Sequence, residues 1–171
     1  MDQNQANQSL KINLQLLNFL AGPFYKQFLA LHSTLSYSLY RDILNEPKYQ
    51  NPLRLEKYGF KGKSQFDEDG IIQEIFKRIG TTNKSFIEIG VGHGTENNTV
   101  YLLANGWKGV WFEKDSNRTE FIEKLFSTAI TPGKLKIIKE FVIAETVDNL
   151  VTNCFPNEEI DLFSLDIDGN D

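Results

Sequence analysis

Residues 85–94, Ser85-Phe86-Ile87-Glu88-Ile89-Gly90-Val91-Gly92-His93-Gly94, decide how the rest of this chain is interpreted. The stretch begins with a short apolar run rich in β-branched and aromatic residues, which is typical of a buried strand. Three glycines at alternate positions follow, and a helical pattern begins near Asn97. A strand, a glycine-rich turn and a helix in this order bring a nucleotide-like ligand close to bare backbone.

The segments around this stretch predict further strands that alternate with helices. A helix is expected from Ser64, its predicted N-cap, to Gly80, and its buried stripe is Ile71, Ile72, Ile75, Phe76 and Ile79. Later strands are predicted at 109–113, 135–142 and 160–167, with helices at 97–104, 116–127 and 146–154. Since parallel strands need such crossovers, the pattern predicts an α/β fold with a doubly wound, mostly parallel sheet.

The N-terminal third has a different character. Residues 1–9 are rich in Gln and Asn and are expected to be disordered. Two helices are predicted at 10–20 and 23–45, separated by Ala21-Gly22-Pro23. We expect an N-terminal helical extension that packs on the main domain, and a partner helix or a membrane surface remain open alternatives. The predicted division is a helical extension at 1–60 and a partial catalytic domain, its cofactor-binding half, at 61–171.

Composition excludes several classes of function. The chain has 171 residues, 40% of them hydrophobic, and a formal net charge of −5 from 18 basic and 23 acidic residues. This balance argues against a nucleic-acid partner, because phosphate backbones attract basic surfaces. No apolar run reaches the roughly 20 residues that a membrane span needs. The single cysteine, Cys154, excludes a disulfide framework and favours a reducing, cytoplasmic location.

The carboxyl ends of the predicted strands gather mostly acidic side chains. Ligands of open α/β sheets bind at this edge. A ring of carboxylates suits hydroxyl and ammonium groups better than a pyrophosphate. Thr95 stands where a dinucleotide fingerprint needs a glycine, and a carboxylate such as Glu113 can accept from both hydroxyls of a ribose. The edge residues are Glu88, Gly90, Gly92, His93, Gly94, Glu113, Lys114, Asp115, Asp166, Asp168 and Asp171.

The pattern Glu88-x-Gly90-x-Gly92-x-Gly94 resembles motif I of class I S-adenosylmethionine-dependent methyltransferases. A wider pattern over roughly residues 60–171 is similar to the FkbM-like family of these enzymes. It consists of Ser64-Gln65, Glu68-Asp69-Gly70-Ile71-Ile72, Phe86-Ile87-Glu88-Ile89-Gly90, Asn98-Thr99, Gly106-Trp107-Lys108-Gly109, Glu113, Ile160-Asp161-Leu162 and Asp166-Ile167-Asp168-Gly169-Asn170-Asp171.

This resemblance implies a Rossmann-like methyltransferase fold of seven strands, C-terminally truncated here after the fourth strand. It implies methyl transfer from S-adenosylmethionine to an oxygen, often on a sugar or polyketide, so the partner would be a small-molecule or glycan acceptor. The implied cofactor-binding residues are Gln65, Glu88, Gly90, Gly92, Gly94, Glu113 and Asp166, and the implied catalytic residues are Asp166 and Asp168. In some relatives carboxylates hold a divalent metal such as Mg²⁺, and Asp166, Asp168 and Asp171 would supply part of such a site.

Two alternatives stay open beside the methyltransferase. The first is a truncated, inactive domain that keeps the fold for binding or assembly. The second is a nicotinamide-dependent oxidoreductase, which Thr95 disfavours. A homo-oligomer formed through the N-terminal helices is also open.

Overall fold

A computed structural model describes residues 3–167 of the chain, with side chains from Gly22 onward. The chain divides into two compact units, Met1–Arg54 and Leu55–Asp171. Among the helices of residues 3–167, none combines the length and the apolar character needed to cross a membrane.

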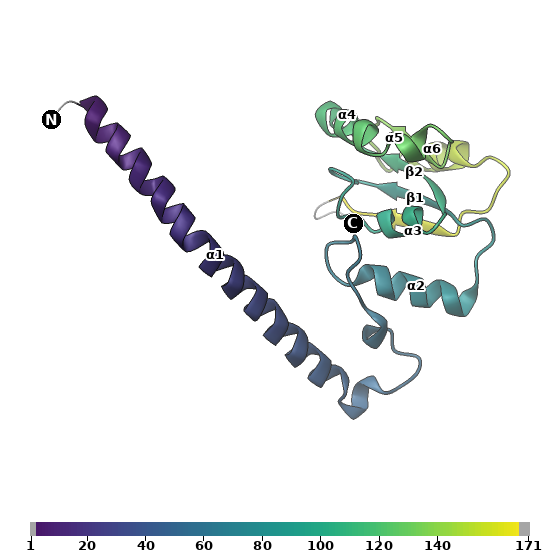
Figure 1. Ribbon diagram of the computed structural model, residues 1–171. Coiled ribbons are helices and arrows are strands. Elements are labelled where there is room, and N and C mark those ends of the chain that lie inside the picture. Colours follow the sequence, from purple (N-terminus) through teal and green to yellow (C-terminus); the bar gives the residue numbers. More distant parts are fainter. Residues whose placement is uncertain (1–2, 168–171) are drawn as a thin grey trace. The chain divides into compact units, whose positions relative to one another are not determined.

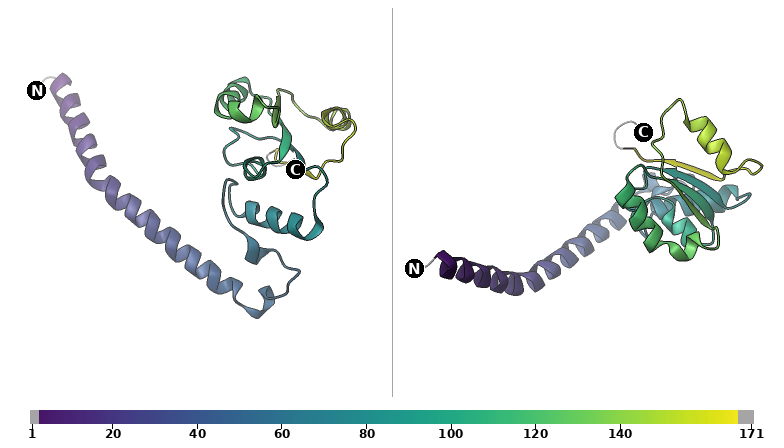
Figure 2. Two further views of the ribbon diagram at one scale, coloured as in Figure 1. Left: turned by 45° about the vertical axis from the view of Figure 1, so that its right-hand side comes forward. Right: turned by 90° about the horizontal axis from the view of Figure 1, so that it is seen from above.

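The first unit is dominated by one long helix, α1 (Gln3–Leu44), followed by the short 3₁₀ helix η1 (Pro47–Tyr49). The prediction of disorder is therefore wrong for residues 3–9, while residues 1–2 lie outside the described residues, and the predicted break at Ala21-Gly22-Pro23 is wrong as well. A proline inside a helix removes one backbone hydrogen bond and bends the helix, while the remaining turns on either side keep theirs. The helix is indeed bent part-way along its length (Figure 2). Its early Gln residues are also good helix formers.

The second unit is an α/β layer whose elements alternate along the chain. The order of the four strands is β3-β2-β1-β4, and every neighbouring pair is parallel (Figure 1). This arrangement confirms the predicted α/β class with a doubly wound, parallel sheet. The elements are η2 (Glu56–Tyr58), α2 (Glu68–Ile79), β1 (Ser85–Ile89), α3 (Val100–Ala104), β2 (Lys108–Phe112), α4 (Ser116–Leu125), α5 (Ser127–Ile130), β3 (Leu135–Ile138), α6 (Val147–Cys154) and β4 (Leu162–Leu165).

Two strands are shorter than their apolar runs predict. β3 pairs with β2 only from Leu135 to Ile138, and β4 pairs with β1 only from Leu162 to Leu165. A residue joins the ladder only where the neighbouring strand lies beside it, and β1 and β2 have five residues each. The apolar residues beyond β3 and β4 therefore leave the sheet and are free to line its carboxyl edge.

Successive residues of the central strands point to opposite faces, and each face has its own core. Phe86 and Trp111 lie on the face that helices α2 to α5 cover. Ile87 and Val110 lie on the face that α6 covers with Val147, Leu150 and Val151. Helices on both faces explain why all five residues of β1 are buried.

The helical stripes were predicted only in part. On α2, Ile72 and Phe76 pack against the core, whereas Ile79 is 73% exposed. On α4, Ile122 is fully buried, whereas Phe121 and Leu125 are about half exposed. Ile79 and Leu125 are the last residues of their helices, whereas Phe121 comes one position before the buried Ile122 and so points about 100° away from it.

The segment before α2 covers a second side of that helix. The Gly70 N–H donates to the Phe60 carbonyl at 3.2 Å, and the Arg78 guanidinium lies 5.1 Å from the centre of the Tyr58 ring. Glu74 is buried on this side and accepts from Arg78 Nε at 2.9 Å. A paired charge in this position explains why α2 buries a glutamate that its apolar stripe does not include.

Candidate functional site

A pocket of about 290 Å³ lies at the carboxyl ends of the strands. The chain leaves β1 toward β2 and β3 on one side, and β4 is added on the other side of β1, so the strand order reverses there. Open α/β sheets bind their ligands in the crevice at such a point. The lining residues come from the ends of all four strands and the start of α4: Ile89, Gly90, Phe112, Glu113, Lys114, Arg118, Glu140, Phe141, Val142, Asp166 and Ile167.

Gly90 brings the ends of three strands together. Its N–H donates to the Phe112 carbonyl at 3.0 Å, and the Asp166 N–H donates to the Ile89 carbonyl at 3.0 Å. Gly90 has a φ of +86°, and a Cβ at this position would overlap the carbonyl oxygen of Asp166. Only glycine fits both the backbone conformation and the close approach.

Glu113 presents a fixed carboxylate to the pocket. The residue is only 4% exposed. Its Oε2 accepts from the Gly92 N–H at 3.0 Å, and its Oε1 accepts from the Asp115 N–H at 2.9 Å. A carboxylate has about four acceptor sites, so these two bonds orient Glu113 without exhausting it. Arg118 Nη1 is 3.9 Å from Oε2.

The start of α4 holds the end of β2 in place. The Asp115 carboxylate caps this helix and accepts from the Asn117 and Arg118 N–H groups at 2.8 and 2.9 Å. These bonds, above all the one from Arg118, hold the pKa of Asp115 below its ordinary value. The Asp115 N–H in turn donates to Glu113, so capping of α4 and orientation of Glu113 form one local structure.

Glu88 lies beneath the loop and is fully buried. Its Oε2 accepts from Asn97 Nδ2 at 2.5 Å, Thr99 Oγ1 at 2.6 Å and the Thr99 N–H at 3.2 Å. Its Oε1 accepts from the Asn98 N–H at 3.0 Å and from Ser164 Oγ at 3.2 Å. Burial raises the pKa of Glu88, although all of these bonds favour the charged form. Glu88 therefore ties β1, β4 and the start of α3 together.

The hydrogen bonds of Glu88 and Glu113 distinguish a dinucleotide, which contains a pyrophosphate, from a ligand without one. In dinucleotide-binding folds the pyrophosphate takes the N–H groups at the start of the helix that follows β1. Here the N–H groups of Asn98 and Thr99, at the start of α3, donate to the Glu88 carboxylate. The Gly92 N–H of the glycine-rich loop donates to Glu113. The protein's own carboxylates thus occupy donors that a pyrophosphate would need.

The structure brings together three of the residues predicted for the site, namely Gly90, Glu113 and Asp166. Within residues 3–167, the other predicted site residues are not among those that line this pocket. Gly92 braces Glu113, and Gly94 packs so closely on the core that a Cβ would lie 3.0 Å from the Trp111 ring. Gln65 is exposed in the loop before α2, where its carbonyl accepts from Lys61 Nζ at 2.9 Å. Asp168 lies outside the described residues.

The pocket residues that were not predicted to bind a ligand include Lys114, Arg118 and Phe141. Lys114 and Phe141 pair across the pocket, with Lys114 Nζ 4.7 Å from the ring centre, and Arg118 reaches it from the first turn of α4. Lys114 was expected at the carboxyl edge of the strands, because it follows Glu113 directly, but it was given no ligand-binding role. Phe141 was assigned to a strand that ends earlier, at Ile138.

The predicted metal site rests largely on residues that the structure does not describe. Within residues 3–167, no group of three or more His, Cys, Asp or Glu side chains is arranged to hold a metal ion. Asp166 is the one predicted ligand in this range, and Asp168 and Asp171 lie beyond it.

Comparisons with known proteins found similar proteins among the solved structures but no match by sequence. No protein-family model matches the chain, and no curated protein matches it at a significant level. Among solved structures, the chain is similar to the glycopeptide N-methyltransferase MtfA, with 14% identity and a TM-score of 0.36 over 54% of this chain and 39% of that one.

Two other methyltransferases are similar at the same low level. One is the C-terminal domain of precorrin-6Y C5,15-methyltransferase from Rhodobacter capsulatus, with 18% identity and a TM-score of 0.36, covering 56% of this chain and 50% of that one. The other is coclaurine N-methyltransferase bound to N-methylheliamine and SAH, with 14% identity and a TM-score of 0.33, covering 84% of this chain and 47% of that one. The match therefore spans half or less of each of these chains.

Proposed function

We propose that the second unit binds S-adenosylmethionine in the pocket at the carboxyl edge of the sheet and serves as the cofactor-binding half of a methyltransferase. The observation that carries the proposal is the Glu113 carboxylate, which lies at the end of β2, lines the pocket and is oriented by two backbone N–H groups. A fixed carboxylate with acceptor sites to spare is suited to the two hydroxyls of a ribose.

The rest of the pocket suits the other parts of this cofactor. Phe112, Phe141 and Val142 offer an apolar wall against which a purine ring can pack. Gly90 leaves bare backbone beside Asp166, and the Asp166 carboxylate is a partner for the cofactor's ammonium group. The pocket volume of about 290 Å³ lies at the lower end of the range for small-molecule sites.

The occupied N–H groups argue against a dinucleotide. Glu88 accepts from the start of α3 and Glu113 accepts from Gly92, so the loop lacks the donor set on which pyrophosphate binding depends. Lys114 and Arg118 do place positive charge in the pocket, which makes a nicotinamide cofactor the competitor to test.

For the reaction, we propose FkbM-like transfer of the methyl group to a hydroxyl of a sugar-like or polyketide-like acceptor. The sulfonium of the bound cofactor supplies the activated methyl group. The chain's task is to align the acceptor oxygen for in-line attack and to take up its proton. We assign that proton to Asp166, assisted by Asp168. Since Asp166 is the only one of the predicted metal ligands in the described residues, no step is assigned to a metal ion.

Calorimetric titration of the full chain tests the proposal. We expect saturable binding of S-adenosylmethionine and of S-adenosylhomocysteine, and no competition by a nicotinamide dinucleotide. Binding of the dinucleotide in place of S-adenosylmethionine would contradict the proposal. Binding without methyl transfer to any of a panel of sugar and polyketide hydroxyls would instead favour the non-catalytic binding module.

A further inference from the structure

The α1 helix carries an apolar seam with the period of a coiled coil. From Leu10 the apolar residues recur in strictly alternating steps of four and three, through three and a half heptads. This is the spacing of a and d positions, which keeps one seam of a helix facing a partner helix. The eight positions are Leu10, Leu14, Leu17, Ala21, Phe24, Phe28, Leu31 and Leu35.

The structure supports the continuity that such a seam needs. α1 runs as one helix from Gln3 to Leu44, so Gly22 and Pro23 do not divide the repeat. In this register Gly22 is at b and Pro23 is at c, and both positions face away from the a and d seam. Beyond Leu35 the next seam positions are Ser38 and Asp42, which end the apolar repeat within the helix.

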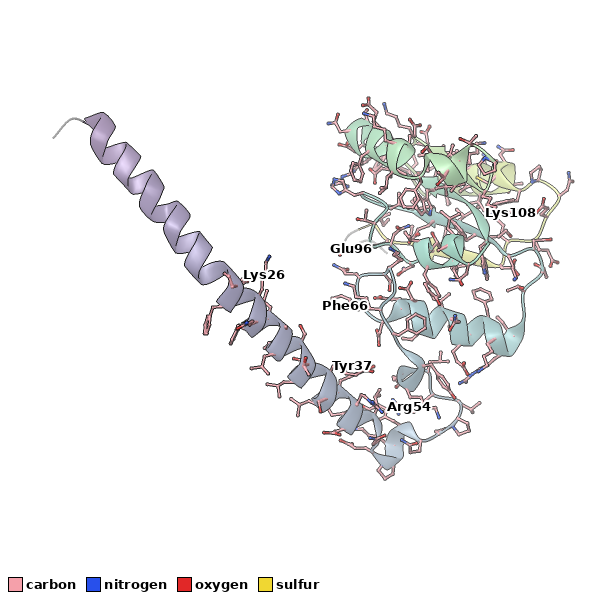
Figure 3. The ribbon with its side chains drawn as sticks, in the orientation of Figure 1. Lys26, Tyr37, Arg54, Phe66, Glu96 and Lys108 are labelled. Carbon is pink, nitrogen blue, oxygen red and sulfur yellow. The ribbon has the colours of Figure 1, made fainter. Side chains whose placement is uncertain are left out.

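The described part of the seam is exposed. Its side chains project from the helix surface along with their neighbours (Figure 3). The exposed fractions are 73% for Phe24, 56% for Phe28, 59% for Leu31 and 56% for Leu35. At roughly 100 Å² each, these four side chains expose about 400 Å². The first half of the repeat adds Leu10, Leu14, Leu17 and Ala21, so the sequence continues the same apolar seam toward the start of the helix.

The charges along the helix favour a second copy of this chain as the partner. Between Gln3 and Tyr40 there is no acidic residue, and the basic residues are Lys11 and Lys26. A membrane-surface helix usually has a polar face rich in Lys and Arg, which α1 lacks. In a parallel, in-register pair the g and e positions that meet would be Asn13 with Asn18, Leu20 with Tyr25, and Gln27 with His32. None of these pairs places like charges together, so nothing repels an identical helix.

We propose that the chain self-associates through α1 as a two-stranded coiled coil along the seam from Leu10 to Leu35. Each copy then provides one binding unit of the kind described above, and the apolar seam of each helix is covered by the other. The proposal is independent of the cofactor assignment, since the pocket contains no residue of α1.

The test uses the full chain and two matched double variants. In the seam variant, Phe28→Lys and Leu35→Lys place charges at two a positions. In the control variant, Leu29→Lys and Ser36→Lys place the same charges at the neighbouring b positions. Lysine is a good helix former, so both variants keep α1, and circular dichroism checks this.

Analytical ultracentrifugation gives the outcome. We expect a dimer for the wild-type chain and for the control variant, and self-association weakened by at least about 100-fold in the seam variant, because four large apolar side chains are lost per dimer. A monomeric wild-type chain, a larger oligomer, or equal behaviour of the two variants overturns the proposal. A monomer that instead co-sediments with vesicles of phosphatidylcholine and phosphatidylserine assigns the seam to membranes and overturns it as well.

Discussion

At the scale of single residues, the site is built around two carboxylates with different tasks. Glu88 is fully buried and accepts from donors of two segments, residues 97–99 and β4, whereas Glu113 is oriented by two backbone donors and still lines the pocket. Glu88 is the fourth residue of β1, whereas Glu113 directly follows β2. Their different tasks arise from the segments that meet them: residues 97–99 and Ser164 surround Glu88, whereas Gly92 and Asp115 orient Glu113.

We expect Glu113→Ala to weaken S-adenosylmethionine binding by more than ten-fold, or about 1.4 kcal/mol, because the ribose hydroxyls lose a charged acceptor. Isothermal titration calorimetry on the full chain measures this. The control is Glu120→Ala, which removes an exposed carboxylate from α4, the helix that follows Glu113. This variant should bind like the wild type.

Glu113→Gln removes the charge and places its amide NH₂ group against one of the two backbone donors that orient Glu113. It keeps one acceptor oxygen and nearly the same shape, so its affinity should lie between those of the wild type and Glu113→Ala. Unchanged affinity in the alanine variant would show that the ribose lies elsewhere.

The sequence predicts the site at residue level only where the backbone alone places a side chain. Gly90, Glu113 and Asp166 directly follow three adjacent strands, and the parallel sheet brings them together. The task of Glu88 depends on Asn97, Thr99 and Ser164, which the fold delivers from loops and from β4. Arg118 and Phe141 reach the pocket from a helix and a loop whose paths no strand pattern predicts.

At the scale of elements, the glycines of the loop after β1 are needed for different reasons. Gly90 and Gly92 both have positive φ, +86° and +59°. A Cβ on Gly90 would overlap the Asp166 carbonyl, whereas a Cβ on Gly92 would meet no atom within 4 Å. The first glycine therefore serves strand packing as well as backbone conformation, and the second serves conformation alone.

We expect Gly90→Ala to lower the free energy of unfolding by about 3 kcal/mol, because conformational strain and steric overlap add up. Gly92→Ala should lose only about 1 kcal/mol, from strain alone. Urea unfolding followed by Trp fluorescence measures both, since Trp107 and Trp111 are buried. Equal losses in the two variants would contradict the close approach of β4 to Gly90.

The start of β4 is held in place by the carboxylate of Asp161. Asp161 accepts from the N–H groups of Thr82, Asn83 and Ser85, at 2.5, 3.0 and 3.1 Å. Burial opposes ionisation, but these hydrogen bonds together outweigh it and hold the pKa of Asp161 below its ordinary value of 3.8. The same turn keeps Lys84 at a φ of +52°, immediately before β1. Asp161 thus joins β4 to the turn that leads into β1.

We expect Asp161→Asn to lower the free energy of unfolding at pH 7 by about 1–3 kcal/mol, since its amide group would face backbone donors. A carboxylate with a lowered folded-state pKa contributes stability above its unfolded pKa and loses it as the pH falls through the folded pKa. The difference between wild type and variant should therefore shrink below about pH 4. Urea unfolding at several pH values measures it, and a difference that grows in acid would contradict the assignment.

Among the elements, β1 was predicted residue for residue, and the alternation that fixes a parallel sheet was sufficient for the fold class. The errors have a common physical origin in tertiary context. β3 and β4 end where their neighbours end, and Ile79 is exposed because α2 does not reach the core at its last residue. The prediction that α1 breaks at Pro23 was wrong because the loss of one backbone hydrogen bond is small for a helix of 42 residues.

At the scale of the whole molecule, the two units have different kinds of surface. The second unit buries its apolar side chains in two cores around one sheet, whereas the first exposes large apolar side chains along a single helix. A unit with its own core can fold alone, whereas a lone helix depends on a partner. The division between the units falls at Arg54 and Leu55, before the domain boundary predicted at residue 60.

The contacts of residues 55–60 lead us to propose the earlier of these two boundaries. The Phe60 carbonyl accepts from Gly70, the Phe60 ring meets Tyr101 edge to face at 5.3 Å, and Tyr58 packs under Arg78. We therefore expect a fragment of residues 55–171 to unfold cooperatively with the cofactor affinity of the full chain. A fragment of residues 61–171 should be about 2 kcal/mol less stable, because it loses these aromatic contacts and exposes one side of α2. Urea unfolding of the two fragments side by side measures the difference. Equal stability would place the boundary after residue 60 and reduce the η2 segment to a linker.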